Sequence, residues 1–156
     1  MCAGISIPRR DLPDKLVERH GIQARIVTRG SASDQEVRFL FRDVEPVLPV
    51  WHDRNLGIFH WGSNDKKSRL PQTGWCLLET LEAGRWRHLQ PEPVDIPACC
   101  GWENSRWFQI EQGIRGILVG DVHGCPHVYM LTEPATHYYR IMTRCERMPA
   151  LIDQTL

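Results

Sequence analysis

The chain has 156 residues, of which 42% are hydrophobic and 24% are charged. This composition is typical of a globular protein with one core, and we expect residues 1–156 to form a single domain. The 19 Lys and Arg residues balance 19 Asp and Glu residues, so the formal net charge is zero. This balance excludes attraction of a polyanion by the whole molecule, and any contact with nucleic acid therefore requires a local basic patch.

The sequence contains no apolar run long enough to span a bilayer, and residues 1–10 lack the apolar stretch of a signal peptide. We therefore expect a cytoplasmic protein without a membrane partner. The chain has 6 cysteines, and in a reducing compartment we expect free thiols rather than disulfides.

The first predicted element is a short helix over residues 11–21. Asp11 can cap its start, Pro13 fits its first turn, and Gly21 can end it. No other segment of the sequence predicts a helix as clearly.

Short strands are expected after this helix, because β-branched and aromatic residues gather in runs separated by turn-like segments. The runs are residues 22–27, 36–41, 44–51, 56–61, 92–102, 107–110, 116–122 and 128–131, with turns at 30–34 and 52–55. Residues 75–81 are apolar and fit either a helix or a strand. A second helix is predicted over residues 135–144. The pattern indicates an α+β fold dominated by short strands.

Cys2 has the most distinctive chemistry in the chain. Removal of Met1 would give Cys2 both a free α-amine and a thiol, and this pair condenses with an aldehyde to form a five-membered thiazolidine. An α-amine is also deprotonated near neutral pH far more often than a lysine. The alternative is an ordinary cysteine in a frayed terminus.

Several short motifs follow the Met1-Cys2 start in a distinctive order. They are the helix at 11–21, PVLPV at 46–50, HWG at 60–62, LET at 78–80, IPA at 96–98 with Glu103, LTEPA at 131–135 and RMPALI at 147–152. This order resembles the SOS-response-associated peptidase (SRAP) family. The resemblance implies a strand-rich domain with a barrel-like β core and short flanking helices. It also implies a DNA-damage protein that crosslinks through Cys2 to abasic sites in single-stranded DNA.

The resemblance also assigns candidate catalytic residues. In the family an Asn, a Glu and a His surround the N-terminal Cys, and these positions fall here on Trp75, Glu103 and Cys145. Cys2 and Glu103 are then expected to carry the reaction, with Glu103 moving protons and Cys145 in place of the histidine. Trp75 would offer a stacking surface for a base, worth about 1–3 kcal/mol. These departures from the family pattern imply a divergent, C-terminally shortened and phage-related member.

Contact with DNA requires positive charge, and Arg147 is the basic residue that matches a family motif. The candidate clusters of basic residues are Arg9 with Arg10, Lys66 and Lys67 with Arg69, Arg85 with Arg87, and Arg144 with Arg147. Arg85 and Arg87 flank Trp86, so they combine guanidinium with an aromatic ring as single-strand grooves do. A solvated surface turn is the alternative for each cluster.

A metal site is an alternative use for His123, Cys125 and His127, which would share one face of a strand and could be joined by Cys99 or Cys100. The glycine and the proline between these residues favour a turn instead. We therefore expect no metal and no cofactor.

The sequence thus predicts a monomer that recognises abasic sites in single-stranded DNA and crosslinks to them through Cys2 after removal of Met1. Whether it is an SRAP-type enzyme, self-processing and lyase-like, stays open. The alternative is a degenerate relative that keeps the fold and acts as a non-catalytic binding module for DNA or protein. In that case Cys2 is unprocessed or is covered by Trp75.

Overall fold

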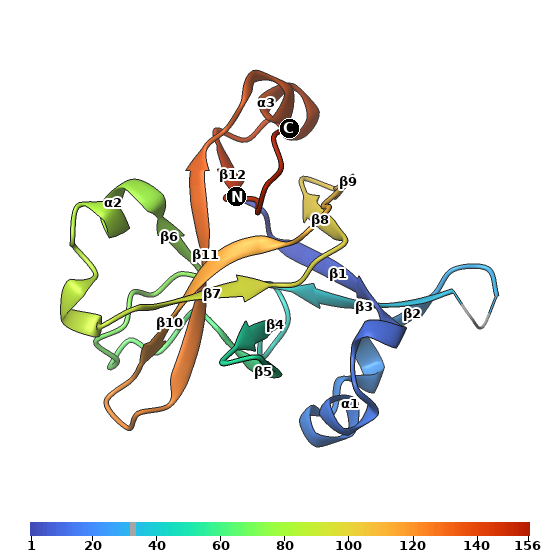
Figure 1. The fold of residues 1–156 in the computed structure, drawn as a ribbon, viewed down its shortest axis with the longest axis horizontal. Coiled ribbons are helices and arrows are strands. Elements are labelled where there is room, and N and C mark those ends of the chain that lie inside the picture. Colours follow the sequence, from blue (N-terminus) through green and yellow to red (C-terminus); the bar gives the residue numbers. More distant parts are fainter. Residues whose placement is uncertain (32–33) are drawn as a thin grey trace.

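Two β-sheets carry the fold in the computed structural model, which describes residues 1–31 and 34–156 (Figure 1). The first is a 5-stranded sheet in the order β2-β3-β1-β8-β9. Its strands are β1 (Gly4–Pro8), β2 (Ile26–Thr28), β3 (Gln35–Leu40), β8 (Cys100–Glu103) and β9 (Arg106–Gln109). Strand β1 joins the β2–β3 hairpin to the β8–β9 hairpin, because it pairs with both β3 and β8.

The second sheet closes on itself as a barrel. Its strands run in the order β10-β7-β4-β5-β11, and β10 also pairs with β11, so among the described strands these close a ring. They are β4 (Val47–His52), β5 (Asn55–Trp61), β7 (Glu92–Ile96), β10 (Ile114–Gly120) and β11 (Pro126–Pro134). Beyond this ring, β6 (Trp75–Leu77) and β12 (Arg147–Pro149) both pair with β11. The strand-rich α+β fold with a barrel-like core is confirmed.

The hydrophobic core forms two clusters. The larger one joins the two sheets and includes Ile5 and Phe39 from the first and Leu48 and Val128 from the second. Its fully buried residues alternate along β3, as expected where only one face of a strand packs inward. The smaller cluster lies around Tyr129, whose side chain contacts the ring of Trp86 in an edge-on arrangement.

Strand β1 was not predicted from the sequence, yet it is the central strand of the first sheet. Gly4 lies opposite Leu40 of β3 on one side and Trp102 of β8 on the other. Cys2 precedes this strand and is 0% exposed. The frayed-terminus alternative for Cys2 is therefore wrong, because the sheet pairs with the chain from its fourth residue onward.

The first helix is shorter than predicted. Helix α1 covers Asp14–His20, and residues Arg9–Asp11 form a separate 3-10 turn, η1. Pro13 lies at the N-cap with an extended ψ of 140 degrees, so Asp11 does not cap the helix. The predicted end is confirmed, because Gly21 adopts the left-handed conformation that stops a helix.

Two pairs of predicted strands that a predicted turn separates form hairpins. Strands β2 and β3 pair, although residues Ile22–Arg25 form a 3-10 turn, η2, and the predicted turn at 30–34 falls partly outside the described residues. Strands β4 and β5 pair through a tight turn in which Asp53 and Arg54 have φ values of 49 and 64 degrees. Both residues are left-handed, as the twist of a two-residue hairpin loop requires.

Two apolar segments of the sequence each divide between elements. Residues 75–81 form β6 and then helix α2 (Leu78–Glu82), and another 3-10 turn, η3, follows at Arg87–Leu89. Residues 92–102 divide into β7 of the barrel and β8 of the other sheet, so the single predicted strand is wrong. Pro97 lies in the break between the two strands.

Helix α3 (His137–Thr143) confirms the second predicted helix with closer bounds. The Thr136 hydroxyl accepts a hydrogen bond from the Tyr139 N–H, and Arg144 ends the helix in the left-handed conformation. Figure 1 shows the N-terminus beside β12 at the end of the molecule where α3 and β8 lie. Within the described ranges, no helix is long and apolar enough to cross a membrane.

Candidate functional site at the N-terminus

The amine of Met1 lies among polar side chains from the end of β8 and the segment after α3, a cluster that we call the N-terminal pocket. Its nitrogen is 3.0 Å from a carboxylate oxygen of Glu103, whose side chain is 6% exposed. It also donates to the sulfur of Cys145 at 3.7 Å. Asn104 joins the two elements, because its side-chain amide donates to the Thr143 carbonyl at 2.6 Å and to the Cys145 sulfur at 3.4 Å. The chain's α-amine is thus held beside a buried carboxylate.

The electrostatics of this pocket favour the charged amine. Burial by itself lowers the pKa of the Met1 amine, but contacts with Glu103 and Cys145 outweigh it, so the pKa is raised above its usual value. The pKa of Cys145 is raised by burial and then by the neighbouring Glu103. Cys145 therefore stays a neutral thiol near neutral pH.

Cys2 lies beneath the Met1 amine and is fully enclosed. Its thiol donates to the Gly4 carbonyl at 3.2 Å, and burial raises its pKa to about 12. The indole N–H of Trp75 donates to the Cys2 carbonyl at 3.0 Å. Trp75 itself packs against Phe41 and Trp61, with ring centroids 4.6 and 5.9 Å away. With Met1 attached, the Cys2 thiol is thus a buried neutral group.

The structure brings together all four residues expected around the N-terminus: Cys2, Trp75, Glu103 and Cys145. It adds Tyr139 of α3 to this group. Tyr139 is 0% exposed, and its hydroxyl has no hydrogen-bond partner in the described part of the chain. Burial raises its pKa, and the nearby Cys2, Glu103 and Cys145 add to the effect. Tyr139 thus places an unused O–H donor in the same pocket.

No protein-family model and no curated protein matches this chain. The resemblance to the SRAP family therefore rests on the order of the sequence motifs, and the roles that it implies stay predictions.

The Arg147 side chain forms hydrogen bonds with neighbouring residues of the protein. Its guanidinium donates two hydrogen bonds to the Glu79 carboxylate, at 2.8 and 3.2 Å, and one to the Thr132 carbonyl at 2.7 Å. The hydrogen bond from Arg147 lowers the pKa of Glu79. A phosphate would have to compete with Glu79 for this side chain, since both prefer the same bidentate geometry.

The other predicted basic residues lie on the surface in different settings. Arg9 donates to the Leu12 carbonyl and pairs with Asp14, whereas Arg10 is exposed. Arg85 and Arg87 are also exposed. Trp86, between them, is only 8% exposed and packs in the smaller core cluster. This aromatic ring therefore serves the core, and the pair of arginines has no stacking partner in it.

A basic aromatic surface that the sequence analysis missed lies on the first sheet. The rings of Trp102 and Trp107 are 6.4 Å apart across the β8–β9 hairpin. The Arg38 guanidinium lies over Trp107 at 4.9 Å, and the Arg42 guanidinium lies over Trp102 at 5.3 Å. The spacing of the two tryptophans around a turn was the available signal, since cross-strand partners share a face. We call these four residues the tryptophan–arginine surface.

The possible metal ligands differ from the His123, Cys125 and His127 set that the sequence offered as an alternative. Within the described residues, the cluster with metal-binding geometry consists of Asp121, Cys125 and His127. His123 is exposed and is not part of it, because residues 121–125 form the loop between β10 and β11 rather than a strand. Cys99 and Cys100 lie elsewhere, at the start of β8.

Proposed function

We propose that this protein captures the aldehyde of an abasic site in single-stranded DNA, through Cys2 after removal of Met1. The observation that carries the proposal is the chain's α-amine, 3.0 Å from the carboxylate of Glu103 in a pocket that also holds Cys145. A carboxylate at this distance can take a proton from an attacking amine and return it to a leaving hydroxyl.

Removal of Met1 is the first requirement of this chemistry. The Met1 amine occupies the position beside Glu103, and Cys2 is 0% exposed while Met1 is attached. Excision would transfer the free α-amine to Cys2 and open the path to its thiol. Cys2 should keep its position relative to β8 after excision, because the Ala3 N–H donates to the Trp102 carbonyl at 2.9 Å.

The covalent step then forms two bonds and releases one water. The Cys2 amine adds to the aldehyde carbon, and the resulting carbinolamine loses water to give an imine. The thiol adds to the imine carbon, and its proton goes to the nitrogen, which completes the thiazolidine. In this proposal Glu103 moves the protons, and the buried Tyr139 hydroxyl, which has no hydrogen-bond partner among the described residues, would donate a hydrogen bond to the departing oxygen.

The tryptophan–arginine surface supports contact with single-stranded DNA. Trp102 lies directly opposite Gly4 in the sheet. Gly4 follows Cys2 by two residues, so the strand that Cys2 precedes pairs with the strand that carries Trp102. Aromatic rings with adjacent guanidinium groups bind bases by stacking and phosphates by charge, without a need for base sequence. This local patch is consistent with a chain whose overall charge is zero.

The test is a crosslinking assay with a single-stranded oligonucleotide that bears one abasic site, read by denaturing gel and intact mass. We expect a heat-stable adduct with the wild type, none with Cys2→Ala and a slower one with Glu103→Gln. Cys100→Ala is the matched control, because Cys100 lies on the same β8 strand as Glu103. A processed wild-type protein that gives no adduct, or an adduct that survives Cys2→Ala, would overturn the proposal.

A second candidate is a non-catalytic binding module, which is favoured by the complete burial of Cys2 and by the hydrogen bond that Trp75 donates to its carbonyl. In this case the wild type retains Met1, gives no adduct and still binds single-stranded DNA. Alanine substitution of Trp102 and Trp107 would then abolish binding, while Cys2→Ala would leave it unchanged. Intact mass and a fluorescence anisotropy titration distinguish the two candidates.

A further inference from the structure

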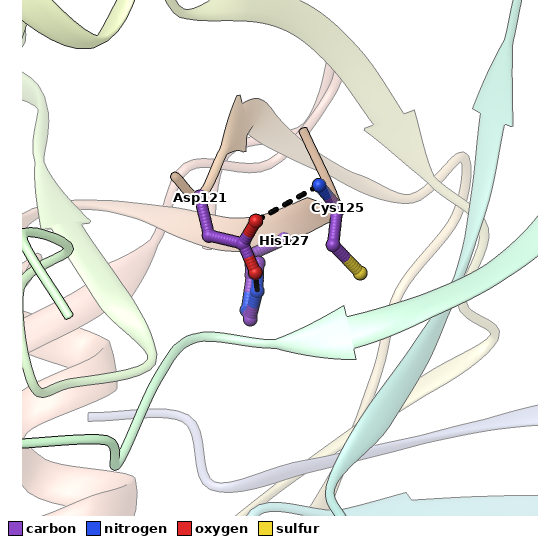
Figure 2. A group of neighbouring side chains, drawn as sticks. All are labelled: Asp121, Cys125 and His127. Carbon is purple, nitrogen blue, oxygen red and sulfur yellow. Dashed lines mark hydrogen bonds and ion pairs between the residues drawn. The ribbon is translucent and has the colours of Figure 1, made fainter. Parts of the chain in front are cut away.

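The loop between β10 and β11 and the start of β11 bring together three potential metal ligands, with Asp121 and Cys125 in the loop and His127 on the strand. The ligand atoms of Asp121, Cys125 and His127 all lie within 4.8 Å of one another. Figure 2 shows the Asp121 carboxylate between the Cys125 backbone nitrogen and the His127 ring, with the Cys125 sulfur on the same side of the loop as the ring. This cluster shares no residue with the N-terminal pocket, so a ligand bound here would be independent of the crosslinking chemistry.

The hydrogen bonds fix the roles of the two His127 nitrogens. Nδ1 is 2.7 Å from the Gly62 carbonyl oxygen, which can only accept, so Nδ1 carries a proton. Nε2 is 3.3 Å from an Asp121 carboxylate oxygen. In a neutral ring, Nε2 then presents a lone pair to a carboxylate, and two acceptors face each other. Either a second ring proton or a metal cation between them resolves this repulsion.

The geometry fits a tetrahedral cation. Two ligand atoms that are about 2.0–2.1 Å from one zinc ion lie about 3.4 Å apart, close to the 3.3 Å between His127 Nε2 and the Asp121 oxygen. A histidine ligand whose other nitrogen donates to a backbone carbonyl is the usual arrangement around bound metals. The Asp121 oxygen that faces away from the ring accepts from the backbone N–H groups of His123 and Cys125, at 2.8 and 2.9 Å. The loop itself therefore holds the carboxylate in place.

Cys125 supplies a third ligand, and its surroundings suit a cation. Its sulfur makes no hydrogen bond to any described residue as a donor or acceptor, although the side chain is half-buried. The cluster lines a cavity of about 390 Å³, whose wall also includes Glu45, Asp65 and His60. The His60 ring lies 5.3 Å from that of His127. Negative charge around the cavity attracts a cation, and its open side leaves room for a water or for His60 as fourth ligand.

We propose that Asp121, Cys125 and His127 bind one zinc ion, which ties the β10–β11 loop to the Gly62 segment. Binding replaces the Cys125 S–H bond with a sulfur–zinc bond, and the proton goes to solvent. The mixture of thiolate, imidazole and carboxylate favours zinc over magnesium or calcium, which prefer oxygen ligands alone.

The test uses chelator-treated protein titrated with Co²⁺ alone and then with Zn²⁺. We expect a thiolate-to-cobalt charge-transfer absorption that saturates at about one ion per chain and disappears when zinc displaces cobalt. Zinc at about 100 times its dissociation constant should raise the unfolding midpoint by about 5–10 °C. Wild-type protein without the absorption would overturn the proposal and leave an ordinary His127–Asp121 ion pair.

Variants locate the site. Cys125→Ser should remove the absorption, and Asp121→Asn and His127→Gln should each weaken binding by more than about tenfold. His123→Gln, on the same loop, and Cys145→Ser, in the N-terminal pocket, are controls that should leave the absorption unchanged. If Cys125→Ser does not fold, the other two variants decide. An absorption lost in Cys145→Ser but kept in Asp121→Asn and His127→Gln would refute the assignment.

Discussion

The ion pair between the Met1 amine and Glu103 should stabilise the fold only while the amine is charged. At 3.0 Å the Coulomb energy is about 1.4 kcal/mol in water and about 5.5 kcal/mol at an effective dielectric constant of about 20. Met1 is 34% exposed and Glu103 loses hydration in the pocket, so solvent screening and desolvation reduce the net contribution to about 1–2 kcal/mol. We expect Glu103→Gln to lower the free energy of unfolding by this amount at neutral pH.

The stabilisation by the Met1–Glu103 ion pair should decrease as the pH rises. Because the folded-state pKa of the Met1 amine is raised, the stabilisation is complete below the unfolded pKa of about 8 and is lost as the pH rises through the folded pKa. Above that point, Glu103 is a buried carboxylate without a cation. The penalty of Glu103→Gln should therefore shrink, and then change sign, as the pH rises through the folded-state pKa of the amine.

Urea denaturation at about pH 7 and about pH 10 measures this effect. The protein must retain Met1, which intact mass verifies. Glu146→Gln is the matched control, because Glu146 is 81% exposed and forms only a 3.4 Å surface pair with Arg140; it should change stability by less than about 0.5 kcal/mol. An equal loss for Glu103→Gln at both pH values would refute the reasoning.

Three further predictions concern packing and access. Gly62→Ala should lower the free energy of unfolding by more than about 3 kcal/mol, which thermal unfolding measures. The φ of Gly62 is 66 degrees, and an added Cβ would lie 2.1 Å from the Thr73 carbonyl oxygen. Trp75→Phe should cost about 1–2 kcal/mol in urea denaturation, since the donor to the Cys2 carbonyl is lost. Cys2 in Met1-retaining protein should react with iodoacetamide at least about 10³-fold more slowly than in the unfolded chain, by peptide mass mapping.

Each of these has its own control. Gly30→Ala is matched to Gly62→Ala, because Gly30 also has a positive φ, 75 degrees, but no atom within 4 Å of an added Cβ. It should cost only about 1 kcal/mol, and equal losses at both sites would contradict the steric argument. An unchanged stability in Trp75→Phe would show that its hydrogen bond to Cys2 contributes nothing. Removal of Met1 should speed labelling of Cys2, and rapid labelling with Met1 attached would contradict its burial.

Local chemistry determined much of the secondary structure. Gly21 ends α1 because glycine adopts a positive φ at little cost, and Asp53 and Arg54 form the predicted turn between two alternating strands. These features depend on residues adjacent in the chain. The strand-rich α+β class followed from the same local patterns, and the structure confirms it.

The first strand and the candidate site depended on contacts that no local pattern contains. Ser6 is fully buried because β1 pairs with β3 and β8, and those strands lie far away in the sequence. The motif order did indicate Cys2 and Glu103, but only the fold places the amine 3.0 Å from the carboxylate. A pairing between distant strands gains its free energy from burial that exists only once both strands are in place.

Residues 121–127 show most clearly what the sequence determined and what the tertiary structure decided. The sequence placed Cys125 and His127 two residues apart and thereby determined that thiol and imidazole lie close together. It also suggested His123 as their partner, whereas the turn directs Asp121 to the cluster instead. The turn geometry follows from the pairing of β10 with β11, which sets where each strand ends. The sequence thus determined which ligand types were available, and the tertiary structure decided which of them meet, because the direction of a side chain depends on a backbone fixed by the neighbouring strands.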